Sequence, residues 1–568
     1  MYCVFCDIPE NLDGIQVYDN CQISNGKPCT SCQQYVEFEE RVIALKNSFI
    51  QQLEQMRDQQ RQLRTAINRR HDPLLRGFPS EILANIFGSY VDSQNVVEKS
   101  CQQVYNNCSP LVLGAVCQSW RRVAWSSPQL WTHISINPRG SDNWICLDVS
   151  QECLSRSGQL PLSIELSLYH PDINHGIYNR EGIFHRLIAL VNQYSSRWEE
   201  LRVICRTEIL PFFCGDLQGA PIIRRILLEY PFDTYHRAED DVKFSIEGIK
   251  PRPTHVSISN FGFKSLDIDW HRVTNIQFHK TRIPLDQFFE LLQQAPELVD
   301  CQLPCLSDSE LAHKYPMREI PIVHHKLRSL EIGKYQGQEL GLFFAFPQLT
   351  HLTIEHVNDL ESEVLSNCVL ALITRSSCRL TFLRLHNVLC DHESLLGLLR
   401  QTPSLRDLEL SICKESLDLF RVLANTSNLA QHSMDSCEEL FLPNLQSIHY
   451  SDIRPVWDTS FWALIPTISG PPWDIQDSLR RPLNNIDFTC RQARWSDPKP
   501  ESMVCKDRNV VLRLMELSNL GVRFNLMHAN VDMLEKSIRH HGITTHEKLE
   551  RDDDLDPVLS IAGSAQTC

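Results

Sequence analysis

Five cysteines stand within the first 34 residues of the chain, and their spacing could support metal binding. Cys3 and Cys6 form one C-x2-C pair, Cys29 and Cys32 form a second, and Cys21 lies between the pairs. Two closely spaced pairs of thiolates can supply the four ligands of a tetrahedral zinc ion. Metal binding would also allow so short and polar a segment to fold. The spacing therefore predicts either a structural zinc site held by Cys3, Cys6, Cys29 and Cys32, or a loosely packed terminus with incidental cysteines.

The same cysteines could in principle belong to a RING-type module, which would make the chain a self-standing ubiquitin ligase. A RING domain needs about eight ligands in two sites. Residues 1–34 contain five cysteines and no histidine. The composition of this segment therefore disfavours a RING domain.

No spacing elsewhere in the chain indicates catalysis. The sequence contains no G-x-S-x-G, no phosphate-binding glycine loop that ends in Lys-Ser or Lys-Thr, and no H-E-x-x-H. Two adjacent histidine pairs, His324-His325 and His540-His541, are poor shared ligands because neighbouring side chains point in different directions. We therefore expect a protein that is not an enzyme and that binds no cofactor other than the possible structural zinc.

The composition is that of an ordinary soluble globular protein, with 42% hydrophobic and 22% charged residues in a chain of 568. The net charge of −15 and the lack of a basic stripe argue against nucleic-acid binding. No leader-like segment and no apolar run near 18 residues is present, so we expect neither secretion nor a membrane span. We expect the 22 cysteines to be reduced thiols, which places the protein in the cytoplasm or the nucleus.

The segment 35–71 is predicted to be one helix, because apolar residues recur in it every seven positions: Val42, Phe49, Met56 and Leu63. At the partner position of this repeat, Leu45 and Ala66 are apolar but Gln52 and Gln59 are polar. Two interpretations remain open. The helix could form a homotypic coiled coil, or it could pack on the segment that follows it.

The segment 72–136 is predicted to be a short helical unit with too much apolar surface for its size. Pro79 suits the first turn of a helix that exposes a wide apolar stripe, and a second helix follows after a polar insert. About 60 residues bury only about 60% of their unfolded surface. We therefore expect part of the apolar surface of this unit to be covered, either by the rest of this chain or by a partner. The stripe residues of the two helices are Ile82, Leu83, Ile86 and Phe87, then Leu113, Val116, Cys117, Trp120, Val123 and Ala124.

The order of these residues resembles the F-box, the adaptor-docking motif of cullin-type ubiquitin ligases. The family pattern is roughly Leu-Pro-x-Glu-Ile-Leu-x-x-Ile-Phe, a gap, Val-Cys-x-x-Trp-Arg-x-Val-Ala and a late Leu-Trp. Here Phe78 replaces the first leucine, and the gap at 91–108 is longer than typical. The resemblance implies a three-helix unit over 72–136 that binds a Skp-type adaptor. The residues it implies as contacts or their immediate support are Pro79, Ile82, Leu83, Ile86, Phe87, Leu113, Val116, Trp120 and Val123.

From about residue 145 onward the pattern changes to short strands and helices. Apolar residues at i, i+3 and i+5 occur nine times, as in Leu349-Leu352-Ile354, and most successive starts are 22 to 31 residues apart. A strand and a helix in a period of 20–29 residues is the signature of leucine-rich repeats. We expect an irregular solenoid over 145–542, an irregular insertion at 451–510 and a disordered tail at 543–568. The order of helix, F-box and irregular repeats resembles a large F-box family of mushroom-forming fungi.

The residues that alternate with the apolar ones in these strands should face outward and form a mixed polar face on the concave side of the solenoid. This face would suit a protein or peptide target. The candidate target-binding residues are Asn275, Gln277, Asp300, Gln302, Ser329, Glu331, His351, Thr353, Phe382, Arg384, Asp407 and Glu409.

The sequence therefore predicts an α+β multidomain protein. The expected function is that of a substrate-recognition adaptor subunit in a Skp–cullin–F-box type ubiquitin ligase, with a Skp-type adaptor, a cullin complex and a protein substrate as partners. The alternative is a scaffold solenoid, without a ligase role, whose F-box-like helices only cap its own repeats.

Overall fold

The computed structural model describes most of the chain between Thr30 and Ile543. The chain divides into two compact units, Met1–Trp131 and Thr132–Cys568. The described residues are 30–71, 74, 77–98, 109–138, 143–169, 181–231, 242–307, 321–336, 340–355, 362–387, 392–411, 417–427, 441–452, 457, 459–470, 481–490 and 503–543.

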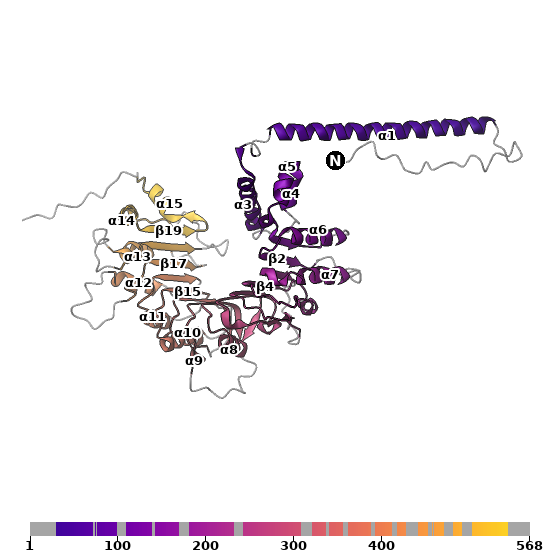
Figure 1. Cartoon of the computed structure of the whole chain (residues 1–568). Helices are drawn as coiled ribbons and strands as arrows, with labels where there is room; N and C mark the ends of the chain where they lie inside the picture. Colours follow the sequence, from indigo (N-terminus) through magenta and orange to yellow (C-terminus); the bar gives the residue numbers. More distant parts are fainter. Residues whose placement is uncertain are drawn as a thin grey trace, which may run out of the picture. The chain divides into compact units, whose positions relative to one another are not determined.

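The first unit begins with one long helix, α1 (Thr30–His71), which is drawn in indigo in Figure 1. The helix predicted for 35–71 is therefore present, and it starts five residues earlier, so that Cys32 lies in its first turn. Its end at His71 agrees with the position of Pro73, because the residue before a proline is disfavoured in the helical conformation.

The described residues of the first unit also include the shorter helices α3 (Ser80–Glu98), α4 (Ser109–Val116) and α5 (Gln118–Trp125). The 3-10 turn η1 (Pro128–Trp131) follows them. The sequence suggested one helix where α4 and α5 stand. The backbone breaks at Cys117, which is extended and caps α5 by accepting a hydrogen bond from the Trp120 N–H at Sγ, 3.4 Å away.

The second unit is a mixed α/β structure built on one large, mostly parallel sheet. Its strands pair in chain order, apart from the antiparallel last strand and β9 (Arg282–Pro284), which pairs with β10. The main strands are β1 (His133–Ile136), β2 (Leu162–Ser167), β3 (Trp198–Ile204), β4 (Arg225–Glu229), β6 (His255–Ser259), β8 (Asn275–His279), β10 (Asp300–Ser307), β12 (Ser329–Gln336), β14 (His351–Glu355), β15 (Phe382–His386), β16 (Asp407–Ser411), β17 (Ser447–Asp452), β18 (Asn485–Cys490), β19 (Arg523–His528) and β20 (Val531–Asp532).

Most strand-to-strand connections of this unit pass through a helix, and Figure 1 shows α10 to α14 along one side of the row of strands. The stretch from β4 to β8 is an exception, because its described residues form 3-10 turns and the short pair β5 (Phe244–Ser245) and β7 (Leu266–Asp267). The helices are α6 (Asn143–Arg156), α7 (Glu181–Asn192), α8 (Leu285–Gln294), α9 (Leu340–Phe343), α10 (Ser362–Ser376), α11 (His392–Arg400), α12 (Leu417–Asn425), α13 (Thr459–Ser469), α14 (Arg508–Asn519) and α15 (Met533–His540).

The apolar i, i+3, i+5 motif produces the core of the second unit. In β14, Leu352 and Ile354 point to the helix side and are fully buried, and Leu349 is buried in the turn before the strand. The corresponding residues of the neighbouring strands are buried in the same way, because parallel register aligns their side chains in rows. Strand β6 adds Val256 and Ile258 to these buried rows, between the strands β4 and β8.

The segment 451–510 is not the irregular insertion that its prolines and tryptophans suggested. It contains α13 and β18, and β18 pairs in parallel with β17 and β19. Its aromatic residues belong to the core: Trp457, Phe461 and Trp462 are all buried, and Trp462 Nε1 donates to the Met503 carbonyl at 3.1 Å. The prediction is wrong because aromatic side chains in this stretch fill a helix–sheet interface.

The boundary between the units also differs from the expected one at 136. The division falls after Trp131, since β1 pairs with β2 in the large sheet. The tail predicted to be disordered, 543–568, lies outside the described residues except for Ile543. Of the helices in the described part of the chain, none is long and apolar enough to cross a membrane.

Candidate functional site

Helix α3 is apolar on two of its faces, and only one of them is buried. The buried face packs into the three-helix unit through Leu83, Ala84, Phe87 and Val91. The other face is exposed, with side chains four residues apart that form one stripe along the helix. We call this stripe the α3 ledge; its residues are Ile82, Ile86 and Tyr90 of α3 together with Phe78, two residues before the helix begins, and each is between 38% and 45% exposed.

Helix α4 exposes a second pair of apolar side chains, Val112 and Val116, which are also four residues apart and are each 51% exposed. Between them, Gly114 faces inward and lies against Trp125 of α5. A Cβ atom at Gly114 would stand only 1.9 Å from the Trp125 ring, so the close approach of α4 and α5 depends on this glycine.

Aromatic contacts hold the three helices together behind the α3 ledge. The rings of Phe87 and Trp120 lie 4.8 Å apart between centroids, and Trp125 meets Trp131 edge-on at 5.3 Å. Trp131 Nε1 also donates a hydrogen bond to the Ala124 carbonyl at 2.8 Å. A packed aromatic interior therefore lies behind the exposed apolar side chains.

The nine residues predicted to contact an adaptor or to support its contacts differ in their exposure. Four are exposed, Trp120 is half-buried, and the remaining four form the interior that supports the surface. The exposed residues are Pro79, Ile82, Ile86 and Val116, and the buried ones are Leu83, Phe87, Leu113 and Val123. Sequence reasoning missed Phe78, Tyr90 and Val112 as surface residues, although the spacing of four from Phe78 to Tyr90 was visible.

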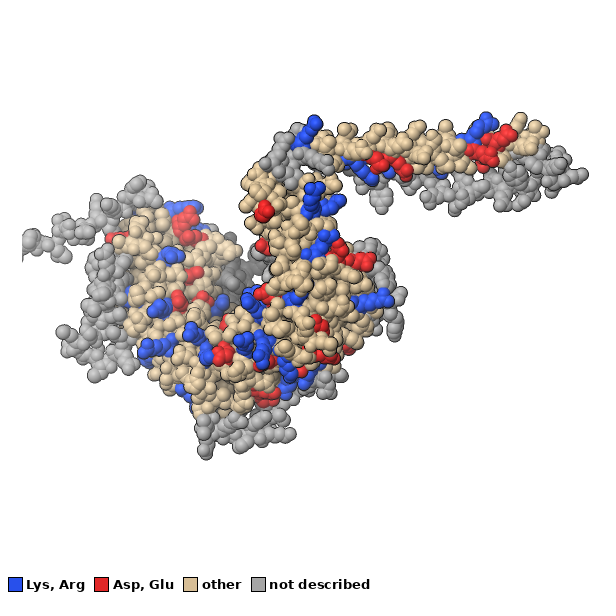
Figure 2. All heavy atoms as spheres, in the orientation of Figure 1, with Lys and Arg blue, Asp and Glu red and all other residues tan. Residues whose placement is uncertain are grey.

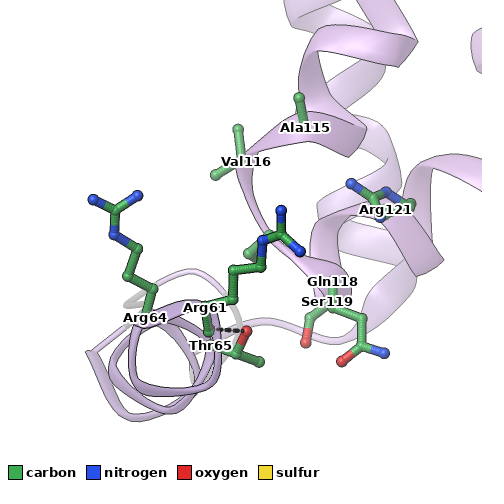
Figure 3. Close-up of a pocket in the computed structure, with 9 residues that line it drawn as sticks. Arg61, Arg64, Thr65, Ala115, Val116, Gln118, Ser119 and Arg121 are labelled. Atoms are coloured by element: carbon green, nitrogen blue, oxygen red, sulfur yellow. Dashed lines mark hydrogen bonds between the residues drawn. The ribbon is translucent and has the colours of Figure 1, made fainter. Parts of the chain in front are cut away.

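A pocket of about 660 Å³ lies in the same unit, where α1 passes α4 and α5 (Figure 3). Arg61 and Arg64 come from α1, Arg121 comes from α5, and Gln118 and Ser119 add polar atoms. The Nε atom of Arg121 donates to the Gly114 carbonyl at 2.9 Å, while the Arg61 guanidinium pairs with Asp58 at 3.1 Å. Three arginines around one pocket favour an acidic group of a ligand or partner.

The structure brings the twelve candidate target-binding residues of the second unit together on one face of the sheet. They lie in two neighbouring rows, because the strands that carry them pair residue for residue. The first row is Asn275, Asp300, Ser329, His351, Phe382 and Asp407, and the second is Gln277, Gln302, Glu331, Thr353, Arg384 and Glu409.

The second row continues into β17, which contains one of the nine motifs although His449 was not among the candidate residues, and into β18, whose motif the sequence analysis did not recognise. Arg384 forms an ion pair with Glu409 at 3.1 Å, and in the next two strands His449 Nδ1 lies 3.0 Å from Asp487 Oδ2. Asp487 lies in β18, whose Leu483-Ile486-Phe488 has the same i, i+3, i+5 spacing as the nine recognised motifs. That spacing was the signal that could have found it.

Three groups of this row have shifted pKa values: those of His449 and Glu331 are raised, and that of Asp487 is lowered. The hydrogen bond to Asp487 raises the pKa of His449, although burial opposes the shift. Burial raises the pKa of the Glu331 carboxyl, and the nearby Glu355 carboxylate raises it further. The row therefore contains one histidine whose protonated form Asp487 stabilises and one carboxyl whose neutral form burial stabilises.

The predicted zinc ligands cannot be placed. Cys3, Cys6 and Cys29 lie outside the described residues, and only the backbone of Cys32 is described, in α1. Among the described residues, no group of three or more His, Cys, Asp or Glu side chains could hold a metal ion. Burial raises the pKa of the Cys205 and Cys301 thiols, so these two cysteines are unreactive core residues.

The chain matches no protein-family model and no curated protein.

Proposed function

We propose that the chain is a substrate-recognition subunit of a Skp–cullin–F-box type ubiquitin ligase. In this proposal, α3, α4 and α5 are the F-box and bind a Skp-type adaptor. The second unit is an irregular leucine-rich-repeat solenoid that binds the target protein.

The α3 ledge is the observation that carries this proposal. Ile82 and Ile86 occupy positions of the F-box pattern, and both are exposed on a helix whose opposite face is already packed. Exposed apolar stripes of this kind are characteristic of protein–protein interfaces. A helix that only capped its own unit would need no second apolar face.

The arginines of the pocket support the same proposal. Arg61, Arg64 and Arg121 place positive charge beside α4 and α5 in a chain whose net charge is −15. Local positive charge next to an apolar surface can orient an acidic partner during association. The partner face that meets the F-box should therefore combine apolar pockets with carboxylates.

The target would bind to the polar face of the sheet. Its two rows of side chains offer donors and acceptors at the regular strand spacing of about 4.8 Å. The contribution of this chain to catalysis would be proximity, since holding a target close to the transferring enzyme raises the effective concentration of the reacting groups.

Co-expression with a Skp-type adaptor tests the proposal. We expect the wild-type chain to co-purify with the adaptor and to recruit a cullin, and we expect the double variant Ile82→Asp/Ile86→Asp to lose both. Leu217→Asp, at a 91% exposed leucine of the second unit, is the matched control and should keep both. Failure of the wild-type chain to bind the adaptor, or full binding by the ledge variant, would favour the scaffold interpretation.

A further inference from the structure

The long helix α1 exposes large apolar side chains along most of its length. A 42-residue helix is about 63 Å long, and most helices of soluble proteins are stable because an apolar face packs against something. The exposed large apolar residues of α1 are Tyr35, Phe38, Val42, Ile43, Leu45, Phe49, Ile50, Leu53, Met56, Leu63 and Ile67.

The distribution of these residues indicates that another helix covers them. Val42, Phe49, Met56 and Leu63 stand at one position of a heptad repeat, preceded by Tyr35, and Phe38 and Leu45 stand at the partner position. A seven-residue apolar repeat is the geometry by which one helix packs along another. The ligand of this face is therefore an elongated helix.

The three-helix unit of the same chain does not cover this stripe. The α1 residues that line the pocket beside α4 and α5 are Arg61, Arg64 and Thr65. All three lie at heptad positions opposite the apolar stripe. Figure 3 shows Arg61 extending from α1 toward α4 and α5, so the polar side of α1 faces these helices and the apolar stripe remains free.

The charge of α1 is divided between its two ends. Residues 30–54 contain four acidic and two basic side chains, and residues 55–71 contain one acidic and five basic side chains. The acidic residues concentrate at Glu37, Glu39 and Glu40, and Figure 2 shows red spheres of acidic side chains at the end of α1 far from α3. Two copies of this helix are complementary in charge only when they run in opposite directions.

We propose that α1 pairs with the α1 helix of a second copy of this chain in an antiparallel two-stranded coiled coil. In the register that aligns the heptads, Leu45 of one copy faces Met56 of the other, and Phe38 faces Leu63. The same register places Val42 opposite Gln59 and Phe49 opposite Gln52, so that no layer contains two glutamines. In a parallel pair, each glutamine would face its own copy and the glutamate-rich ends would repel each other.

This inference does not depend on the proposed ligase function. Where both hold, the dimer would present two target-binding faces in one assembly and would increase the avidity for a target with two binding segments.

The mass of the full-length chain in solution, measured by light scattering in a reducing buffer, tests the pairing. We expect a dimer of the 65.6 kDa chain, and we expect Leu45→Asp/Met56→Asp to be a monomer. Asn47→Asp/Gln51→Asp, which changes two α1 residues on the side away from the stripe, should remain a dimer. A wild-type monomer, or a dimer that persists in the Leu45/Met56 variant, would overturn the proposal.

Photo-crosslinking tests the direction. Benzoylphenylalanine is incorporated in place of Gln59, and equal amounts of ¹⁵N-labelled and unlabelled chain are mixed, so that crosslinks between copies carry both labels. We expect mixed-label crosslinks to the tryptic peptide 42–46. Crosslinks to the segment around position 59 of the other copy would overturn the antiparallel arrangement, and crosslinks only within one chain would overturn the pairing itself.

Discussion

The rings of Phe87 and Trp120 lie 4.8 Å apart between centroids with their planes inclined by 44°, and this contact joins α3 to α5. Ile86, the residue before Phe87, is 38% exposed, whereas Phe87 is 1% exposed. Two adjacent apolar residues of one helix thus have different roles. Phe87 holds the three-helix unit together, and Ile86 is available to a partner.

Replacement of each residue by alanine should separate these roles. Phe87→Ala removes a buried aromatic ring and should lower the local free energy of unfolding by about 3–5 kcal/mol. Ile86→Ala changes a surface residue and should alter it by no more than about 0.5 kcal/mol. Hydrogen exchange of the α3 and α5 amides measures both values in the full chain. Equal effects of the two substitutions would contradict the assignment of the two faces.

Gly114 provides a second test of the packing. In Gly114→Ala, the new Cβ would overlap the Trp125 ring, and overpacking of this kind destabilises by about 1–3 kcal/mol or more. Gly88→Ala is the matched control, since its Cβ meets only Leu130 at 4.0 Å and alanine favours a helix by up to about 1 kcal/mol. Thermal unfolding monitored by tryptophan fluorescence distinguishes them. A tolerated Gly114→Ala would show that α4 and α5 do not pack as described.

Arg481 is a buried arginine that connects three segments of the second unit. Its guanidinium donates hydrogen bonds to the carbonyls of Leu423, Thr426, Phe441 and Leu442 over 2.9–3.1 Å, and also to the Thr426 hydroxyl at 2.8 Å. Since the side chain is 2% exposed, water cannot replace these donors when they are lost.

Arg481→Met should therefore lower the free energy of unfolding by about 3 kcal/mol, because it leaves several buried carbonyls without donors. Arg421→Met is the control. Arg421 pairs with Asp418 at 2.8 Å but is 58% exposed, and an exposed ion pair contributes at most about 1 kcal/mol. Urea unfolding monitored by circular dichroism compares the two. A control as destabilised as the Arg481 variant would refute the structural role of the buried guanidinium.

The pair formed by His449 and Asp487 should make the polar face sensitive to pH. Burial alone would raise the pKa of Asp487, but hydrogen bonds from His449 and Asn525 outweigh it and hold the pKa below its usual value. The pKa of His449 is raised above 6.5 by the same contact. The pair therefore stabilises the fold between the lowered pKa of Asp487 and the raised pKa of His449. Its contribution disappears as the pH rises through the His449 pKa or falls through the Asp487 pKa.

NMR titration of selectively labelled histidine measures this shift. We expect His449 to titrate above 6.5 in the wild-type chain and at a lower pH in Asp487→Asn. His255 is the internal control: burial and the nearby Arg225 lower its pKa, and it should titrate below 6.5 in both proteins. A His449 titration that Asp487→Asn leaves unchanged would contradict the pairing.

Side-chain periodicity predicted many of the described strands of the second unit correctly. The strands around Leu352 and Leu383 are confirmed, because the i, i+3, i+5 spacing marks a buried strand and the turn before it. The α13–β18 stretch was missed because its prolines and tryptophans resemble a loop in composition, although Phe461 and Phe488 pack against each other in the core with centroids 5.2 Å apart.

The features that the sequence could not reveal depend on contacts between distant residues. His449 and Asp487 are 38 positions apart, and only the register of β17 and β18 brings them together. The difference in exposure between Ile86 and Phe87 likewise depends on which side of α3 packs against α5. The break at Cys117 occurs without a proline or glycine at that position, and it accompanies the close approach of Gly114 in α4 to Trp125 in α5.

The affinity of the purified full-length chain for a purified Skp-type adaptor, measured by isothermal titration calorimetry, tests the central proposal most directly. We expect the wild-type chain to bind, and we expect Ile82→Ala/Ile86→Ala to raise Kd by about 30-fold or more, since buried apolar anchors each contribute 1 kcal/mol or more at such interfaces. A wild-type chain that does not bind, or a double variant that binds with unchanged affinity, would contradict the assignment of the α3 ledge as the adaptor-binding surface.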